Sequence, residues 1–115
     1  MTKKWLVCSM LLLLCSCGKN HFPQTLDLTE NWRFSPDPGN NGIAEKWHTD
    51  QLDDGQWALL TASQRWEDQG FKELDGTAWY RKTIEVPSNW RGKDIWLKFA
   101  GVSDAYELFV NGKSV

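Results

Sequence analysis

The stretch AWYRKTIEV, residues 78–86, decides the fold class of this chain. Tyr80, Ile84 and Val86 share one face of the stretch, while polar and charged side chains share the other. A period of two is what a half-buried β-strand requires. Pro87 then supplies no backbone donor and ends the strand. The chain is therefore predicted to be built from β-strands.

Shorter segments on both sides repeat the pattern. Residues 95–99 alternate clearly, and residues 57–61 form a brief apolar run. Nearer the start, residues 26–28 and 32–34 alternate around a turn, and Pro36 and Pro38 are expected to stop the second of these strands. These segments predict a series of short strands joined by turns.

The last predicted strand ends at Val110 and is followed by Asn111-Gly112. This dipeptide tolerates the positive φ angles of a type I′ hairpin turn better than most others. A two-residue loop here pairs Val110 with Lys113 and places Leu108 opposite Val115. Val115 is therefore expected to begin a returning strand.

The fold is predicted to be all-β. After residue 25 no amphipathic helix of useful length can be drawn, although residues 43–47 are compatible with one helical turn inside a long loop, residues 39–54. Several short strands with turns between them favour a β-sandwich or jelly roll, which has about eight strands. Five or six strands are predicted here, so the sandwich is expected to be incomplete at its C-terminal end.

The first residues have the layout of an export signal, which is set apart from the fold. Two lysines precede an apolar run, residues 5–14, that is much shorter than the ~20 residues needed to span a bilayer. Leu14-Cys15-Ser16-Cys17 resembles the lipobox of bacterial lipoproteins, which implies cleavage after residue 16 and lipidation of Cys17. The alternative is an ordinary secretory peptide with Cys17 as a bystander.

The predicted organisation has three parts: a lipoprotein signal peptide over residues 1–16, the lipidated Cys17 with a tether over residues 17–25, and a domain over residues 26–115. Several acyl chains on one cysteine would give stable anchoring. Gly18 stands where an aspartate commonly signals retention in the inner membrane. The predicted location is therefore the cell envelope, at the outer membrane of a Gram-negative-type bacterium.

Cysteine and charge restrict the partners of the domain. All three cysteines, at positions 8, 15 and 17, precede the domain, so it is expected to fold without a disulfide. Removal of residues 1–16 leaves 11 of the 13 Lys and Arg and all 15 Asp and Glu, a formal net charge of −4. Nucleic acid is therefore not an expected partner.

Four strings in the domain are more specific than its periodicity. They are residues 26–34, with LDL leading to WRF; residues 53–57, DDGQW; residues 76–87, GTAWYRKTIEVP; and residues 99–113, with FAGV followed by VNGK. In this order and spacing they closely resemble the N-terminal sugar-binding domain of family 2 glycoside hydrolases, the group of β-galactosidases, β-glucuronidases and β-mannosidases.

This resemblance implies a galactose-binding-like jelly roll that precedes an immunoglobulin-like domain and a catalytic (β/α)₈ barrel, neither of which is in this chain. It implies a non-catalytic accessory domain, inactive alone, whose parent is a hydrolase. The implied partners are a carbohydrate of the β-galactoside type, the membrane through the lipid anchor, and the barrel of the parent protein. Further strands after the Asn-Gly-Lys hairpin are also implied.

The acidic residues are not expected to form a catalytic pair. Glycoside hydrolysis uses two carboxyl groups about 5–9.5 Å apart. Asp53 and Asp54 lie in a predicted turn, where Asp commonly makes turn hydrogen bonds. The only histidines are His21 and His48, too few for a dedicated metal site, so no metal or cofactor is predicted. A calcium site on loop carboxylates stays open, without support from EF-hand spacing.

Tryptophan is the informative residue type, because sugar rings stack on indole. Trp32 and Trp57 are expected in the core, whereas Trp79 and Trp96 are expected on the opposite face, toward a following domain. The predicted sugar contacts are Trp66, Glu67, Asp68 and Gln69, in a loop that in the resembling hydrolases reaches toward the active site. Arg81 is expected in a structural ion pair or at a domain interface.

Three other interpretations remain open at this stage. The chain could be a stand-alone glycan-binding lipoprotein. The string WEDQG, residues 66–70, is also similar to the domain carried by sialate O-acetylesterases, so the chain could be the accessory domain of such an enzyme. The third interpretation is a structural β-domain that holds a partner protein.

Overall fold

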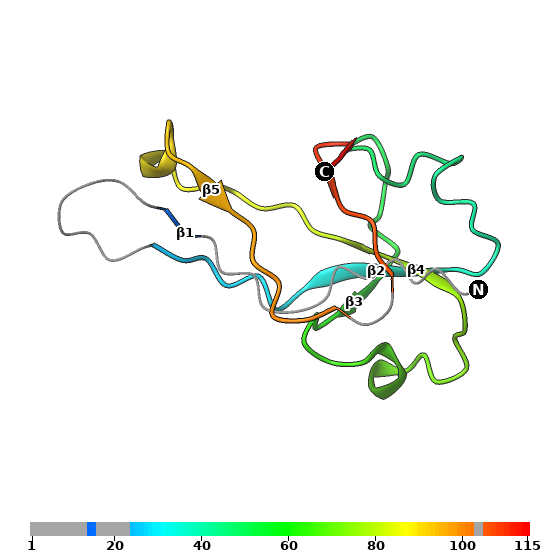
Figure 1. Ribbon diagram of the computed structural model, residues 1–115. Helices are drawn as coiled ribbons and strands as arrows, with labels where there is room; N and C mark the ends of the chain where they lie inside the picture. Colours follow the sequence, from blue (N-terminus) through cyan, green and yellow to red (C-terminus); the bar gives the residue numbers. More distant parts are fainter. Residues whose placement is uncertain (1–13, 16–23, 103–104) are drawn as a thin grey trace.

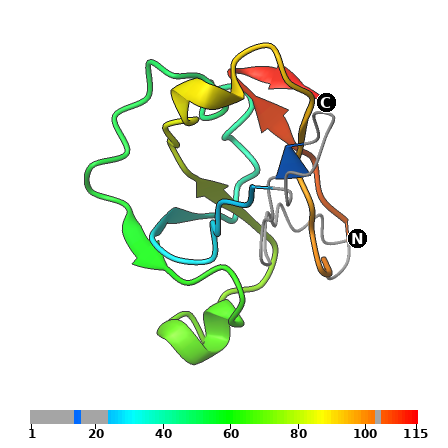
Figure 2. The ribbon, with the colours of Figure 1, turned by 90° about the vertical axis from the view of Figure 1, so that its left-hand side faces the viewer.

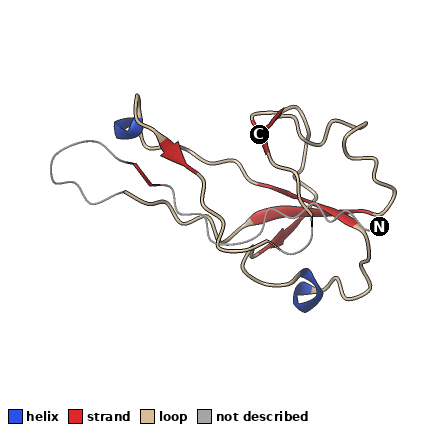
Figure 3. Ribbon diagram, in the orientation of Figure 1, coloured by secondary structure: helices blue, strands red, loops and turns tan. Residues whose placement is uncertain are grey.

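A computed structural model describes residues 14–15, 24–102 and 105–115 (Figure 1). Its strands are β1 Leu14–Cys15, β2 Trp32–Asp37, β3 Ala58–Leu60, β4 Thr77–Arg81, β5 Ile95–Trp96, β6 Phe109–Val110 and β7 Lys113–Ser114. Two short 3₁₀ helices, η1 Trp66–Gln69 and η2 Ser88–Trp90, interrupt the loops (Figure 3). The all-β prediction is confirmed.

The predicted lipidation residue Cys17 and the predicted tether up to residue 23 lie outside the described residues, as does most of the predicted export signal. Within the described ranges, no helix is long and apolar enough to cross a bilayer.

The centre of the fold is an antiparallel sheet in the order β3-β2-β4. Strand β2 pairs with β4 from Arg33↔Arg81 to Asp37↔Thr77. It continues through Pro36, so the expectation that this proline stops the strand is wrong. The reason is that β3 pairs only with the first half of β2, which leaves Pro36 at an edge on that side, where a missing N–H is tolerated.

Strand β4 ends at Arg81 and not at Val86 as predicted. Its partner β2 begins at Trp32, and the residue before it, Asn31, has a positive φ of 59° that turns the chain away. Beyond Arg81 the alternating sequence therefore has no partner strand. The strand predicted over residues 95–99 is similarly reduced to Ile95–Trp96, and residues 26–28 form no strand.

The predicted hairpin is confirmed. Asn111 and Gly112 have φ angles of 50° and 76°, and Val110 pairs with Lys113. The amide of Val115 donates to the carbonyl of Leu108 over 3.0 Å, which continues the pairing as expected. A separate two-stranded pairing joins β1 to β5 in the register Leu14↔Trp96 and Cys15↔Ile95, which the sequence did not predict.

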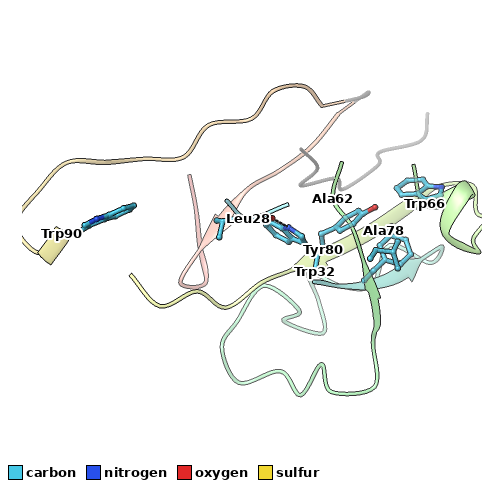
Figure 4. Close-up of a cluster of buried hydrophobic side chains, with 9 residues drawn as sticks. Leu28, Trp32, Ala62, Trp66, Ala78, Tyr80 and Trp90 are labelled. Carbon is cyan, nitrogen blue, oxygen red and sulfur yellow. Dashed lines mark hydrogen bonds between the residues drawn. The ribbon is translucent and has the colours of Figure 1, made fainter. Parts of the chain in front are cut away.

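The main hydrophobic core lies on one face of the central sheet (Figure 4). Phe34 of β2 is 1% exposed, and its ring centroid lies 4.8 Å from that of Tyr80 and 4.6 Å from that of Phe71. Trp32 is buried at the same face, as predicted. Burial of aromatic side chains of this size is a large favourable contribution to folding.

The opposite face of the sheet is also covered. Helix η1 lies on the core side, whereas the β6–β7 hairpin and the loop over residues 38–57 lie on the other side, an arrangement visible in two perpendicular views (Figures 1 and 2). All of the first four residues of β4, Thr77–Tyr80, are consequently buried. The sheet is thus the middle layer of three.

Candidate functional site

The predicted sugar-contact segment forms the single turn of helix η1. Arg65 precedes it in an extended conformation, and Gly70 ends it with a φ of 105°, a left-handed conformation that glycine adopts readily. The amides of Gly70 and Phe71 both donate to the carbonyl of Trp66. The four predicted residues therefore lie in one helical turn, and their side chains have different surroundings.

Trp66, one of the predicted sugar contacts, is buried in the structure. Its side chain is only 4% exposed and packs against Phe34, with ring centroids 5.9 Å apart. Stacking on a sugar requires a free indole face, and this indole is part of the core (Figure 4).

Gln69 is engaged by the backbone around it. Its side-chain oxygen accepts the amide of Thr61 over 2.8 Å, and its side-chain nitrogen donates to the carbonyls of Thr61 and Gln64 over 2.9 and 3.1 Å. These bonds tie helix η1 to the end of β3. The side chain of Gln69 therefore has a structural role in this fold.

Glu67 and Asp68 are the more accessible members of the segment. Glu67 is half-buried, and its Oε2 lies 3.5 Å from Nε of Arg65, whose side chain is largely solvated. Asp68 is exposed. An exposed pair of this kind contributes little to stability. Sugar contact by the four residues stays a prediction, and the polar groups free to make it are the two carboxylates.

A second constellation lies on the other face of the sheet, around the buried carboxylate of Asp37. This side chain accepts three N–H groups: those of Asn41 over 2.8 Å, Gly42 over 2.9 Å and the Trp79 indole over 3.0 Å. Asp37 is 3% exposed. Because a buried polar group is costly without partners, this full set of donors fixes the start of the loop against β4.

Arg81 holds the far end of the same loop. Its Nε lies 2.9 Å from the Asp54 carboxylate, and its terminal nitrogen donates to the carbonyls of Trp47 and Thr49. The guanidinium also lies 6.0 Å from the ring centroid of Trp57. The prediction of a structural ion pair for Arg81 is confirmed. Asp53, as predicted, accepts a turn hydrogen bond, from the amide of Gly55 over 3.0 Å.

Between these two anchors the loop and hairpin form a second aromatic cluster. Trp47 contacts Trp57 and Trp79 edge to face at centroid distances of 5.1 and 6.1 Å, and Phe109 stacks on Trp79 at 5.8 Å. Trp79 is 5% exposed, so the expectation that it faces a following domain is wrong: the chain's own loop and hairpin cover it. Trp57, expected in the core, is half-buried in this cluster.

The titratable groups offer no metal cluster in the part of the chain that the structure describes, where no three His, Cys, Asp or Glu side chains converge. One carboxyl has a perturbed pKa. The hydroxyl of Thr29 and then its amide donate to Asp27, and these bonds hold the pKa of the Asp27 carboxyl below its ordinary value. This is a local turn at the surface.

Sequence reasoning missed the roles of Asp37 and Trp79. A signal was present in Asp37-Pro38-Gly39-Asn40-Asn41-Gly42, since an Asp four and five residues before successive amides can cap a turn. The sequence alone did not reveal the contact with Trp79, because Trp79 is 42 residues away from Asp37.

Fold and site together define an all-β domain with aromatic layers on both faces of one sheet. Residues 65–115 match the sugar binding domain of glycosyl hydrolases family 2. The matched region includes helix η1, β4 and the β6–β7 hairpin. The match supports the resemblance found in the sequence, at the level of the N-terminal sugar-binding domain of this family.

Two relatives extend the similarity toward the start of the domain. A β-glucuronidase of Paenibacillus borealis is 34% identical over 91 residues, which are 77% of this chain and 15% of the relative. A β-galactosidase of Thermoanaerobacter pseudethanolicus is 29% identical over 92 residues, 78% of this chain and 12% of the relative. The chain thus spans about a seventh or less of these proteins. No solved structure matches.

Proposed function

We propose that this chain is the non-catalytic, carbohydrate-binding-type accessory domain of a lipid-anchored family 2 glycoside hydrolase. The observation that carries the proposal is the match of residues 65–115 to the sugar binding domain of that family. The names of the two relatives, a β-glucuronidase and a β-galactosidase, point to β-linked sugars as ligands. Catalysis would belong to another part of the parent protein.

The lipid anchor is the second part of the proposal. It is supported by Leu14-Cys15-Ser16-Cys17 and by the short apolar run before it. Acylation of Cys17 would hold the domain at the cell envelope, at the outer membrane. Its test is Cys17→Ala: the expected result is release of the chain into the soluble fraction, and unchanged retention in the membrane fraction would refute the anchor.

Sugar binding is tested on the chain itself and on a version extended by the reading frame that follows Val115. Methyl β-glucuronide and methyl β-galactoside serve as calorimetric ligands, and aryl glycosides of both sugars serve for turnover. We expect hydrolysis only in the extended version. Turnover by this chain alone would refute the non-catalytic assignment, whereas tight sugar binding by this chain alone would favour a stand-alone glycan-binding lipoprotein.

A further inference from the structure

Residues 86–98 form one end of the molecule, which we call the tip, and its surface has no role in the function proposed above. It contains helix η2 and strand β5 and lies at one end of the longest axis, which measures 50 Å (Figure 1). The central sheet and the β6–β7 hairpin lie toward the other end. The tip thus lies away from helix η1 and from the β6–β7 hairpin, while its buried Trp90 belongs to the main hydrophobic core.

The tip exposes large apolar side chains. Trp96 is 64% exposed, Val86 45% and Ile95 43% while β5 is paired with β1. Cleavage after residue 16 would remove β1, so β5 would lose this partner strand in the processed chain. A shallow cleft of about 280 Å³ adjoins them, with Val86, Pro87 and Ile95 in its wall beside the cations Arg91 and Lys93. Exposed apolar groups gathered at one place mark interaction sites more often than scattered ones do.

The charge of the tip is opposite in sign to that of the domain. Residues 86–98 carry three basic side chains, Arg91, Lys93 and Lys98, and one acidic side chain, Asp94. The chain after residue 16 has a formal net charge of −4. A local basic, apolar and tryptophan-bearing surface on an acidic domain is complementary to the headgroup region of an anionic membrane.

Gln24, close to the predicted lipidation residue Cys17 in the sequence, lies at the same end of the molecule. The side-chain oxygen of Gln24 accepts from the Asn89 side-chain amide over 3.2 Å and from the Trp90 indole, so the end of the predicted tether is fastened to helix η2. Cys17 is seven positions before Gln24 in the sequence. A fully extended chain of that length reaches about 25 Å. A lipid on Cys17 would therefore lie within that distance of Gln24.

We infer that the tip is a membrane-contacting surface, which binds anionic phospholipid headgroups through Arg91 and Lys93 and places Trp96 at the bilayer interface. The inference rests on the proposed lipid anchor. A basic patch close to a lipid anchor adds attraction to anionic lipids and would orient the anchored domain on the membrane. The anchor and tip together would direct the opposite end of the domain, with its hairpin, away from the membrane.

The experiment uses the processed, lipidated chain reconstituted in vesicles of equal parts phosphatidylglycerol and phosphatidylcholine. The leader takes Cys8 and Cys15 with it and the Cys17 thiol is acylated, so Trp96→Cys introduces a single free thiol for the environment-sensitive dye NBD. The matched control is Leu59→Cys, at a position 56% exposed on β3 and away from the tip. We expect the NBD emission at position 96 to become brighter and blue-shifted. The emission at position 59 should show neither change.

The charge contribution is tested in the same vesicles. Arg91→Glu combined with Lys93→Glu should abolish the shift at position 96, and so should vesicles of phosphatidylcholine alone. Lys72→Glu combined with Lys113→Glu makes the same change of charge outside the tip and should leave the shift intact.

Each contrary outcome has a distinct meaning. Equal emission at positions 96 and 59 in membrane-bound protein would refute membrane contact by the tip, and the proposal of a lipid anchor would be unaffected. Loss of the chain from the membrane fraction would refute the anchor, and the tip with it. A shift in lipid-free detergent that grows with protein concentration would assign the surface to a second copy, and a shift produced by soluble methyl β-galactoside would assign it to sugar; either result would overturn the membrane assignment.

Discussion

Replacement of Asp37 by Asn tests the claim that a buried carboxylate fixes the loop over residues 38–57. The carboxylate accepts three N–H groups at 2.8, 2.9 and 3.0 Å, and the side chain is 3% exposed. An amide of the same shape has one accepting oxygen, so at least one of the three donors must face its NH₂ group. The substitution changes the hydrogen bonding while it keeps the volume.

The expected loss follows from these contacts. One charge-assisted hydrogen bond disappears and one buried N–H is left without an acceptor, which together cost about 2–3 kcal/mol. For a domain of this size the corresponding fall in Tm is roughly 10 °C or more. The matched control is Asp53→Asn, since Asp53 is exposed and accepts only the amide of Gly55. A surface change of this kind should cost no more than about 0.5 kcal/mol.

Unfolding in urea, followed by tryptophan fluorescence, measures both variants against a parent that carries Cys17→Ala to prevent lipidation. Trp47, Trp57 and Trp79 lie in the affected layer, so the emission of the folded state should also change in Asp37→Asn. Equal stability of Asp37→Asn and Asp53→Asn would refute the argument that the three donors depend on the buried carboxylate.

Three further changes have definite expected outcomes. Gly42→Ala would place a Cβ 2.3 Å from the Trp79 indole nitrogen and should cost about 1–3 kcal/mol in urea unfolding, whereas Gly101→Ala, with open space around it, should stay within about 0.5 kcal/mol of the parent. Phe34→Ala should cost about 3–5 kcal/mol and lose the cooperative melt, whereas Leu59→Ala, at an exposed site, should keep it. Because the pKa of Asp27 is lowered in the folded chain, its contribution to stability is present above the ordinary value of 3.8 and is lost as the pH falls through the folded value. Thr29→Ala should raise that pKa in an NMR titration, and an unchanged titration curve would contradict the role of the hydroxyl.

Local signals in the sequence predicted the local parts of the fold. Asn111-Gly112 specified the hairpin and its register because the φ angles of a two-residue turn depend on those two residues alone. The strand at residues 77–81 was predicted from its alternation. Its end was misplaced because strand length depends on the partner: the pairing of β4 with β2 ends at Arg33↔Arg81.

The burial of β4 could not be predicted from alternation, because both of its faces are covered. Trp79 and Tyr80 point to opposite sides and are 5% and 6% exposed. A period-two pattern separates two faces but does not say that each has a layer of its own. The layer over Trp79 depends on contacts such as Arg81 with the carbonyl of Trp47, between residues 34 apart in the chain. The same long-range packing decided that Trp66 belongs to the core.

The placement of the tryptophans changes what their number implies about sugar recognition. Of the seven after residue 16, Trp32, Trp66, Trp79 and Trp90 are buried, and Trp47 and Trp57 are half-buried against other aromatic rings. Trp96 alone among the seven has a largely exposed side chain, and it belongs to the tip. Tryptophan abundance in this domain therefore reflects a thin sheet with an aromatic layer on each face. A sugar bound by this chain alone would depend on polar groups such as Glu67 and Asp68, with little stacking, so its affinity should be weak.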